Sequence, residues 1–171
     1  HLLNFGTKMS LLEELDKRVE EKLLNRKENG DLLLYNYTDY CAFEGKWDEY
    51  TRQARGLVAH KDGTIVARPF EKFFNLGQKE ALINPNLAYN VYPKRDGSLG
   101  IAYYYNNQWN VVTRGSFDNP FIDYAKTFLH KFVAFPKNLT ILVEICMPPE
   151  LDGLVRAVKE TPGLHLLGAV N

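Results

Sequence analysis

The chain has 171 residues, and its 21 Lys and Arg residues balance 21 Asp and Glu residues, so the formal net charge is zero. This balance excludes a uniformly basic nucleic-acid binder, and the short apolar runs exclude a membrane-spanning segment. With 45% hydrophobic and 13% aromatic residues, the composition excludes a disordered chain and predicts one domain, or part of a larger one, with a buried core.

The first predicted element is a helix near the N-terminus. Ser10 and Glu13 have the spacing of a capping box, and leucines then recur at helical intervals from Leu11 to Leu24. Asn29-Gly30 is the expected stop signal. We expect an amphipathic helix here, followed by a strand over 31–37 and a loop over 38–50.

Two hairpins are predicted next, because turn-forming segments separate pairs of strand-like runs. They join 56–60 to 64–68 and 101–105 to 109–113. Asn119 followed by Pro120 predicts the start of a second helix. Further strands are expected over 139–145, 154–158 and 164–170. This succession predicts an α+β fold, in which antiparallel β-sheets are covered by a few helices.

The cysteines and the first residues bear on location. Cys41 and Cys146 are too few for a disulfide framework, and they show no zinc-type spacing with the four histidines. The start at His1–Phe5 lacks the charged and apolar regions of a secretory signal. We therefore expect an intracellular, cytoplasmic protein.

The sharpest local pattern is Lys94-Arg95-Asp96-Gly97-Ser98-Leu99, which follows a strand-like run over 90–93. Pro93 restricts the backbone ahead of the lysine, and Gly97 permits a turn and a close approach to a ligand. A lysine held in this way is a candidate nucleophile. The alternative is an exposed hairpin turn, which is also the interpretation of Lys61-Asp62-Gly63.

A second pattern is a basic stretch inside the neutral chain. Residues 52–72 carry an excess of three positive charges from Arg52, Arg55, Lys61, Arg68 and Lys72 against Asp62 and Glu71. Cations beside Phe70, Phe73 and Phe74 suit a ligand that carries both phosphates and a base. The alternative is that the phenylalanines are core residues and the charges are solvated.

Two further signals lie downstream. Arg114-Gly115-Ser116 follows a predicted strand, and Glu144 stands inside the apolar run Leu142-Val143-Glu144-Ile145. An acid in such a strand is costly unless it is paired, hydrogen-bonded or close to a metal. The alternative for Glu144 is an outward position on a half-exposed strand.

In this order, the four signals resemble the covalent nucleotidyltransferase superfamily of ATP-dependent ligases and capping enzymes. The motif Lys-x-Asp-Gly-Ser-Leu at 94–99 and the run Arg-Pro-x-Glu-Lys-Phe-Phe-Asn at 68–75 are most similar to the phage-type RNA ligases that repair broken tRNA. DNA ligases and capping enzymes typically carry Arg where Leu99 stands. The resemblance extends from about Tyr35 to the C-terminus.

The resemblance implies roles by position. Lys94 would attack the α-phosphate of ATP and hold AMP as a lysyl phosphoramidate, while Arg55 and Lys72 would bind the triphosphate. Arg114 would contact the ribose or a phosphate, and Glu144 would lie near the ribose or a metal-bound water. The remaining nucleotide-site residues implied are Phe74 as a neighbouring aromatic, Asp96 and Gly97 as shapers of the loop, and main chain near Tyr92 for the adenine. ATP and magnesium would be the cofactors, and RNA with 5′-phosphate and 3′-hydroxyl ends, tRNA among them, the partner.

The sequence departs from the family pattern after Glu144. Asp152-Gly153-Leu154-Val155 resembles the expected Glu-Gly-x-Val motif, but it comes only eight residues after Glu144, so we interpret it as a turn and strand. No Lys-x-Lys motif follows, and the chain ends in an apolar strand. We therefore expect 1–171 to be the N-terminal portion of a nucleotidyltransferase (ATP-grasp-like ligase) domain, incomplete at its C-terminus. A non-catalytic nucleotide- or RNA-binding module of the same fold, or a capping- or DNA-ligase-type enzyme, are the alternatives.

Overall fold

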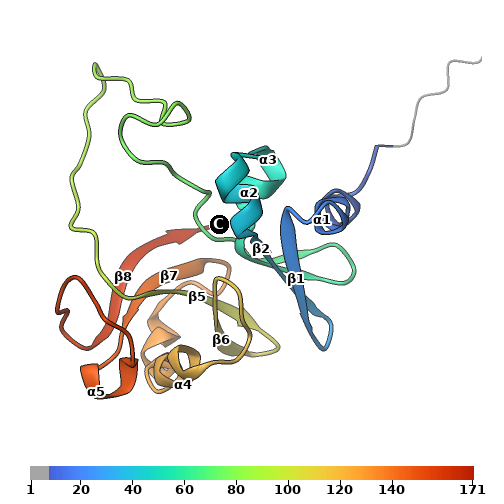
Figure 1. Cartoon of the computed structure of the whole chain (residues 1–171). Coiled ribbons are helices and arrows are strands. Elements are labelled where there is room, and N and C mark those ends of the chain that lie inside the picture. Colours follow the sequence, from blue (N-terminus) through green and yellow to red (C-terminus); the bar gives the residue numbers. More distant parts are fainter. Residues whose placement is uncertain (1–7) are drawn as a thin grey trace, which may run out of the picture.

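The computed structural model describes residues 8–171, so the interpretation of His1–Phe5 lies outside the described residues. Its strands form two four-stranded antiparallel sheets, which we call sheet A, in the order β1-β2-β3-β4, and sheet B, in the order β6-β5-β7-β8 (Figure 1). The α+β prediction with antiparallel sheets and covering helices is therefore confirmed.

The bounds of the elements follow the chain. Sheet A consists of β1 (Leu24–Asn29), β2 (Leu32–Tyr37), β3 (Arg55–His60) and β4 (Ile65–Ala67). Sheet B consists of β5 (Ser98–Tyr105), β6 (Gln108–Thr113), β7 (Thr140–Cys146) and β8 (Gly163–Val170). The helices are α1 (Leu11–Glu20), α2 (Asp39–Glu44), α3 (Glu49–Gln53), α4 (Pro120–Lys126) and α5 (Pro149–Asp152), with a 3₁₀ helix, η1, at Leu129–Ala134.

The core is layered because successive side chains of a strand point to opposite faces of its sheet. In β2, Leu32 and Leu34 face sheet B, whereas Leu33 and Tyr35 face α1. The layer between the sheets contains Leu32, Leu34, Val58, Ala67, Ile101, Tyr103, Val112 and Leu142. On the far side of sheet B, Ala102, Val143 and Ile145 pack against α4 and η1. The order of layers is thus helix, sheet A, sheet B, helix.

Three predicted elements differ from the structure. Helix α1 ends at Glu20 because Lys22 adopts a positive φ of 61°, and the chain then enters β1, where Leu24 pairs with Tyr37. Asn29 is the last residue of β1, and Gly30-Asp31 is the turn of a β-hairpin rather than the region beyond a helix end. The predicted loop over 38–50 contains α2 and the start of α3, and the predicted strand over 154–158 is irregular.

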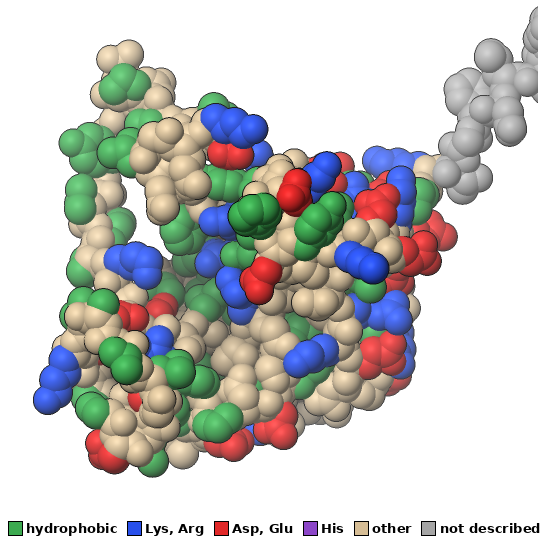
Figure 2. Space-filling model, in the orientation of Figure 1, with side chains coloured by type: hydrophobic (Ala, Val, Ile, Leu, Met, Phe, Trp, Pro, Cys, Tyr) green, Lys and Arg blue, Asp and Glu red, His purple; other side chains and the backbone are tan. Residues whose placement is uncertain are grey.

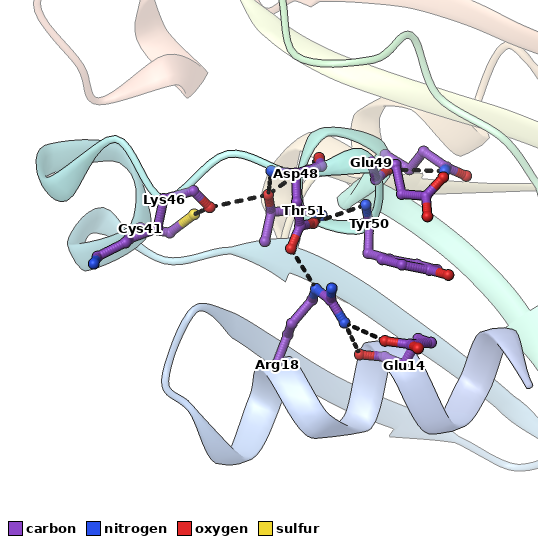
Figure 3. A network of polar contacts seen from close by, with 9 residues as sticks. Glu14, Arg18, Cys41, Lys46, Asp48, Glu49, Tyr50 and Thr51 are labelled. Atoms are coloured by element: carbon purple, nitrogen blue, oxygen red, sulfur yellow. Dashed lines mark hydrogen bonds and ion pairs between the residues drawn. The ribbon is translucent and has the colours of Figure 1, made fainter. Parts of the chain in front are cut away.

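A polar network docks α1 against α3 (Figure 3). Arg18 donates from Nε to Asp48 Oδ2 at 2.7 Å and from Nη1 to Glu14 Oε2 at 2.7 Å. Asp48 also caps α3 by accepting from the backbone N–H groups of Tyr50 and Thr51. Burial opposes ionisation of Asp48, but these hydrogen bonds and the Arg18 charge hold its pKa below the ordinary value. The network fixes the N-terminal helix on the outer face of sheet A.

The two sheets are joined by a long connection over 68–97 that contains no helix or strand. In Figure 1 it runs from β4 past α2 and α3, arches away from the body, and returns to β5. The predicted strand-like run over 90–93 is therefore irregular. No helix within residues 8–171 is long and apolar enough to cross a membrane.

Candidate functional site

The site begins where β3 of sheet A meets the end of β6 in sheet B. Gly56 has a φ of 95°, and a Cβ there would meet Ile101 and, at 3.2 Å, the Cα of Arg114. A glycine is therefore needed for the two backbones to approach so closely. This approach places Arg55, at the start of β3, beside Arg114, which directly follows β6.

The Arg55, Arg114 and Lys72 side chains form a cluster of positive charge. Burial lowers the pKa of Arg55, and the charge of Arg114 lowers it further. Burial and then the charges of Arg55 and Arg114 lower the pKa of Lys72. Arg55 Nε is buried and has no hydrogen-bond partner among residues 8–171. Arg55 and Lys72 are half-buried and Arg114 is exposed, so the cluster brings like charges together at the edge of the core. An anion such as a polyphosphate would neutralise this charge.

Aromatic rings line this cationic cluster. Trp47 packs edge-on against Tyr37 and Phe74, with ring centroids 5.0 and 5.6 Å away. Lys72 Nζ lies 4.8 Å from the Phe74 centroid. Arg114 donates from Nη1 to Tyr37 Oη at 2.9 Å and lies over the ring. Of the three predicted aromatics, Phe74 and Phe73 lie beside the basic side chains Lys72 and Arg55. Phe70 instead packs against the layer between the sheets, as the core alternative expected.

The lysine motif is an irregular approach to β5, so the hairpin-turn alternative for 94–99 does not hold. Lys94 is exposed, and Gly97 packs so closely on β7 that a Cβ there would meet the Ile145 carbonyl. Gly97 N–H donates to Glu144 Oε1 at 3.0 Å. Burial raises the pKa of Glu144, which the Gly97 hydrogen bond and the Lys94 charge oppose. Glu144 is thus not an outward residue of a half-exposed strand; its side chain holds the lysine loop.

One cleft joins the two halves of the site. It has a volume of about 410 Å³, and Arg55, Arg114, Gly97 and Asn119 are among its lining residues. Figure 2 shows basic side chains gathered around a hollow beside the 68–97 connection. Tyr92, whose main chain is predicted to meet the adenine, lies in the irregular connection and is 78% exposed. Lys61, interpreted as structural, lies in the β3–β4 turn and pairs with Glu28 at 3.2 Å.

Comparisons with known proteins assign the chain to a family. A family model described as RNA ligase matches residues 53–171. The chain belongs to the RNA ligase family. A protein of Autographa californica nuclear polyhedrosis virus, described as a bifunctional polynucleotide kinase/RNA ligase, is 32% identical over 67% of this chain and 17% of its own length. RNA ligase 1 of Bacteriophage TS2126 is 29% identical over 68% of this chain and 33% of its own length. The chain therefore spans a third or less of either curated relative.

In this RNA ligase family member, sequence reasoning missed several residues of the site. Tyr37 and Trp47 lie before the matched region and carry no motif, although they contact Arg114 and Phe74. Asn36 Oδ1, which is buried, also has no hydrogen-bond partner among the described residues. An aromatic-rich run before the basic stretch was the only available signal, and it equally fits a core strand.

Side chains that could hold a metal ion lie beside the lysine motif of this chain. One carboxylate oxygen of Glu144, Oε1, accepts the hydrogen bond from Gly97 N–H, and the other oxygen takes no part in that hydrogen bond. Among the described residues, ligand atoms of Cys146, Glu160 and His165 also lie within 4.8 Å of one another. Burial raises the pKa of the Cys146 thiol to about 11, and both Glu160 oxygens accept hydrogen bonds. These three residues are thus poorly prepared to ligate a metal.

Proposed function

We propose that the chain is the N-terminal portion of the nucleotidyltransferase domain of an ATP-dependent RNA ligase. It would join RNA 5′-phosphate and 3′-hydroxyl ends, with tRNA a candidate substrate. The observation that carries the proposal is the single cleft at which Arg55 and Arg114 meet Gly97 of the lysine motif. Membership of the RNA ligase family and the named relatives support it.

The first step would be transfer of AMP to Lys94. Its Nζ attacks the α-phosphorus of ATP, an N–P bond forms, the amine loses a proton, and the bond to the bridging oxygen breaks as pyrophosphate leaves. Such a reaction depends mainly on positioning and on neutralising charge. Arg55, Lys72 and Arg114 supply that charge in a partly buried place, where it acts more strongly than in water.

Glu144 and Phe74 would have supporting roles in this step. The second oxygen of Glu144 could hold a water of a magnesium ion, which when bound offsets charge on phosphate oxygens. Phe74 keeps Lys72 over its ring and so limits where that ammonium can lie. Asp96 and Gly97 would shape the loop, and backbone near Tyr92 would meet the adenine.

The later steps would use the RNA. A 5′-phosphate oxygen attacks the phosphorus of the lysyl-AMP, which releases the Lys94 amine and leaves AMP on the RNA end. The 3′-hydroxyl of the second end then attacks the 5′-phosphate, AMP leaves, and a phosphodiester bond remains. These steps would require the same cations, since in each of them the reacting phosphorus is surrounded by negatively charged oxygen atoms.

The test is covalent labelling of the natural gene product with ATP and magnesium. We expect an adduct with the mass of AMP on Lys94 that survives alkali and is hydrolysed by acid, as a phosphoramidate is, and no adduct in Lys94→Ala. Lys61→Ala is the matched control, because Lys61 also precedes an Asp-Gly pair but lies in a hairpin turn, and it should label like the wild type. Labelling of Lys94→Ala at the wild-type level would contradict the mechanism. ATP binding without any adduct would favour a non-catalytic module instead.

A further inference from the structure

A segment far along the chain holds the backbone of the lysine motif. The irregular segment after α5 returns to the 95–98 region before it enters β8. We call four residues the clasp: Arg156, Val158 and Glu160, which contact this region, and Asp152 at the end of α5, which holds Arg156. No regular secondary structure fixes residues 91–97, so the contacts of side chains decide where this loop lies.

Glu160 supplies one half of the clasp. Its side chain is only 10% exposed, and its two oxygens accept from different groups of the loop. Oε2 accepts from Arg95 Nη1 at 3.0 Å, and Oε1 accepts from the backbone N–H of Asp96 at 3.2 Å. The hydrogen bond from Arg95 is the main reason that the pKa of Glu160 is below its ordinary value. Glu160 therefore acts as a charged acceptor for the two residues that follow Lys94.

Arg156 supplies the other half. It donates from Nη1 to the Gly97 carbonyl at 3.1 Å, and this nitrogen lies 3.8 Å from Asp96 Oδ1. Its Nε and Nη2 donate to the two oxygens of Asp152, at 2.7 and 3.0 Å. This bidentate pair holds the guanidinium plane in one orientation. Asp96 Oδ2 in turn accepts from Val158 N–H at 3.1 Å. The clasp and the loop therefore each donate hydrogen bonds to the other.

Three consecutive backbone groups are thus held by charged side chains. Asp96 N–H is bound by Glu160, Gly97 N–H by Glu144, and the Gly97 carbonyl by Arg156. Hydrogen bonds to charged groups are stronger and shorter than neutral ones. An exposed lysine at the head of an irregular loop would otherwise sample many positions, and catalysis depends on holding reacting atoms to within about 1 Å.

We propose that Arg156 and Glu160 are positioning residues for Lys94, which set the place of its amine in the cleft without touching the nucleotide themselves. The proposal rests on the proposed function, because positioning matters only if Lys94 accepts AMP. It assigns a role to a segment in which the sequence suggested only a turn and a strand.

The experiment compares binding with chemistry in the natural gene product. For Arg156→Met and Glu160→Gln, we expect ATP affinity within about threefold of wild type, but lysyl-AMP formation in a single turnover about 10- to 100-fold slower. Arg156→Lys, which can still donate to the Gly97 carbonyl but cannot pair bidentately with Asp152, should lie between. Amide hydrogen exchange over 94–99 should become faster in the slow variants.

The control is Arg26→Met, which also removes an arginine with two acidic partners, Asp16 and Glu28, but lies on β1 away from the cleft. It should label at the wild-type rate. Suppose that Lys94→Ala forms no adduct, whereas Arg156→Met and Glu160→Gln fold and label like the wild type. The positioning proposal is then overturned and the proposed function stands. If Lys94→Ala labels normally, both proposals fall. Should Arg156→Met not fold, Glu160→Gln and Arg156→Lys decide the question by the same criteria.

Discussion

Among the charged groups of the site, the guanidinium of Arg55 opposes folding most. It is half-buried, its Nε lacks a partner among the described residues, and the charges of Arg114 and Lys72 repel it, although Glu144 attracts it. We expect Arg55→Met to raise the free energy of unfolding by about 1 kcal/mol, since it removes a half-buried charge beside two like charges, while it abolishes polyphosphate binding. Urea unfolding and titration with pyrophosphate would measure the two effects. Arg26→Met, which loses paired charges, should gain no stability, and a less stable Arg55→Met would contradict the assignment.

Glu144 gives a pH dependence with a definite sign. Burial raises its pKa in the folded protein above the ordinary value of 4.5, so the folded state holds the proton more tightly than the unfolded state. The carboxyl group therefore costs no stability below pH 4.5, and its cost appears as the pH rises through the raised folded value. Relative to Glu144→Gln, the wild type should lose stability from pH 4.5 upward. Thermal unfolding at a series of pH values checks this, and the opposite slope would contradict it.

At the scale of elements, Gly56 decides how closely β3 approaches the end of β6. Gly56→Ala should destabilise the fold by about 1–3 kcal/mol, because it combines an unfavourable positive φ with a contact to the backbone of Arg114. Gly63→Ala is a matched control: Gly63 has a similar φ of 96°, but a Cβ there would meet nothing within 4 Å. The urea midpoints of the two variants separate backbone strain from contact. Equal losses would show that the close approach does not matter.

The elements that the sequence predicts correctly are those whose signals are local. The hairpins around Lys61 and Asn106 depend on turn residues between strand-like runs, and Asn119 caps α4 as expected. The predicted end of α1 was wrong because Leu24 fits a helical pattern. Only the pairing of Leu24 with Tyr37 decides that it is a strand residue. Tertiary contacts override local periodicity there.

The same distinction between local sequence signals and long-range contacts applies to the candidate site. The motif at 94–99 is visible because six adjacent residues carry it, and the RNA ligase family is confirmed by the comparisons. The clasp could not be predicted, since Arg156 and Glu160 reach Gly97 and Asp96 across 59 and 64 residues of sequence. Neither stands in a regular element, so no periodic pattern marks it.

At the scale of the whole molecule, the connection over 68–97 is the part most open to proteases. It has no regular structure, and Leu82, Tyr89 and Val91 are more than 80% exposed. We expect trypsin to cut first at Lys79 and chymotrypsin first at Tyr89, as identified by mass spectrometry. The nicked product should elute as one species in native gel filtration, because the layer between the sheets holds both fragments. First cuts inside a strand, or separation of the fragments, would contradict the expectation.

Each sheet is also built from one continuous stretch of chain, sheet A from 24–67 and sheet B from 98–170. During synthesis the whole of sheet A leaves the ribosome before the first strand of sheet B emerges, so sheet A can pair its strands with α1 already in place. One face of it, with Leu32, Leu34 and Val58, then stays uncovered until sheet B arrives. The nascent protein thus exposes an apolar sheet face during translation, and Arg55 of β3 leaves the ribosome before Lys94 does.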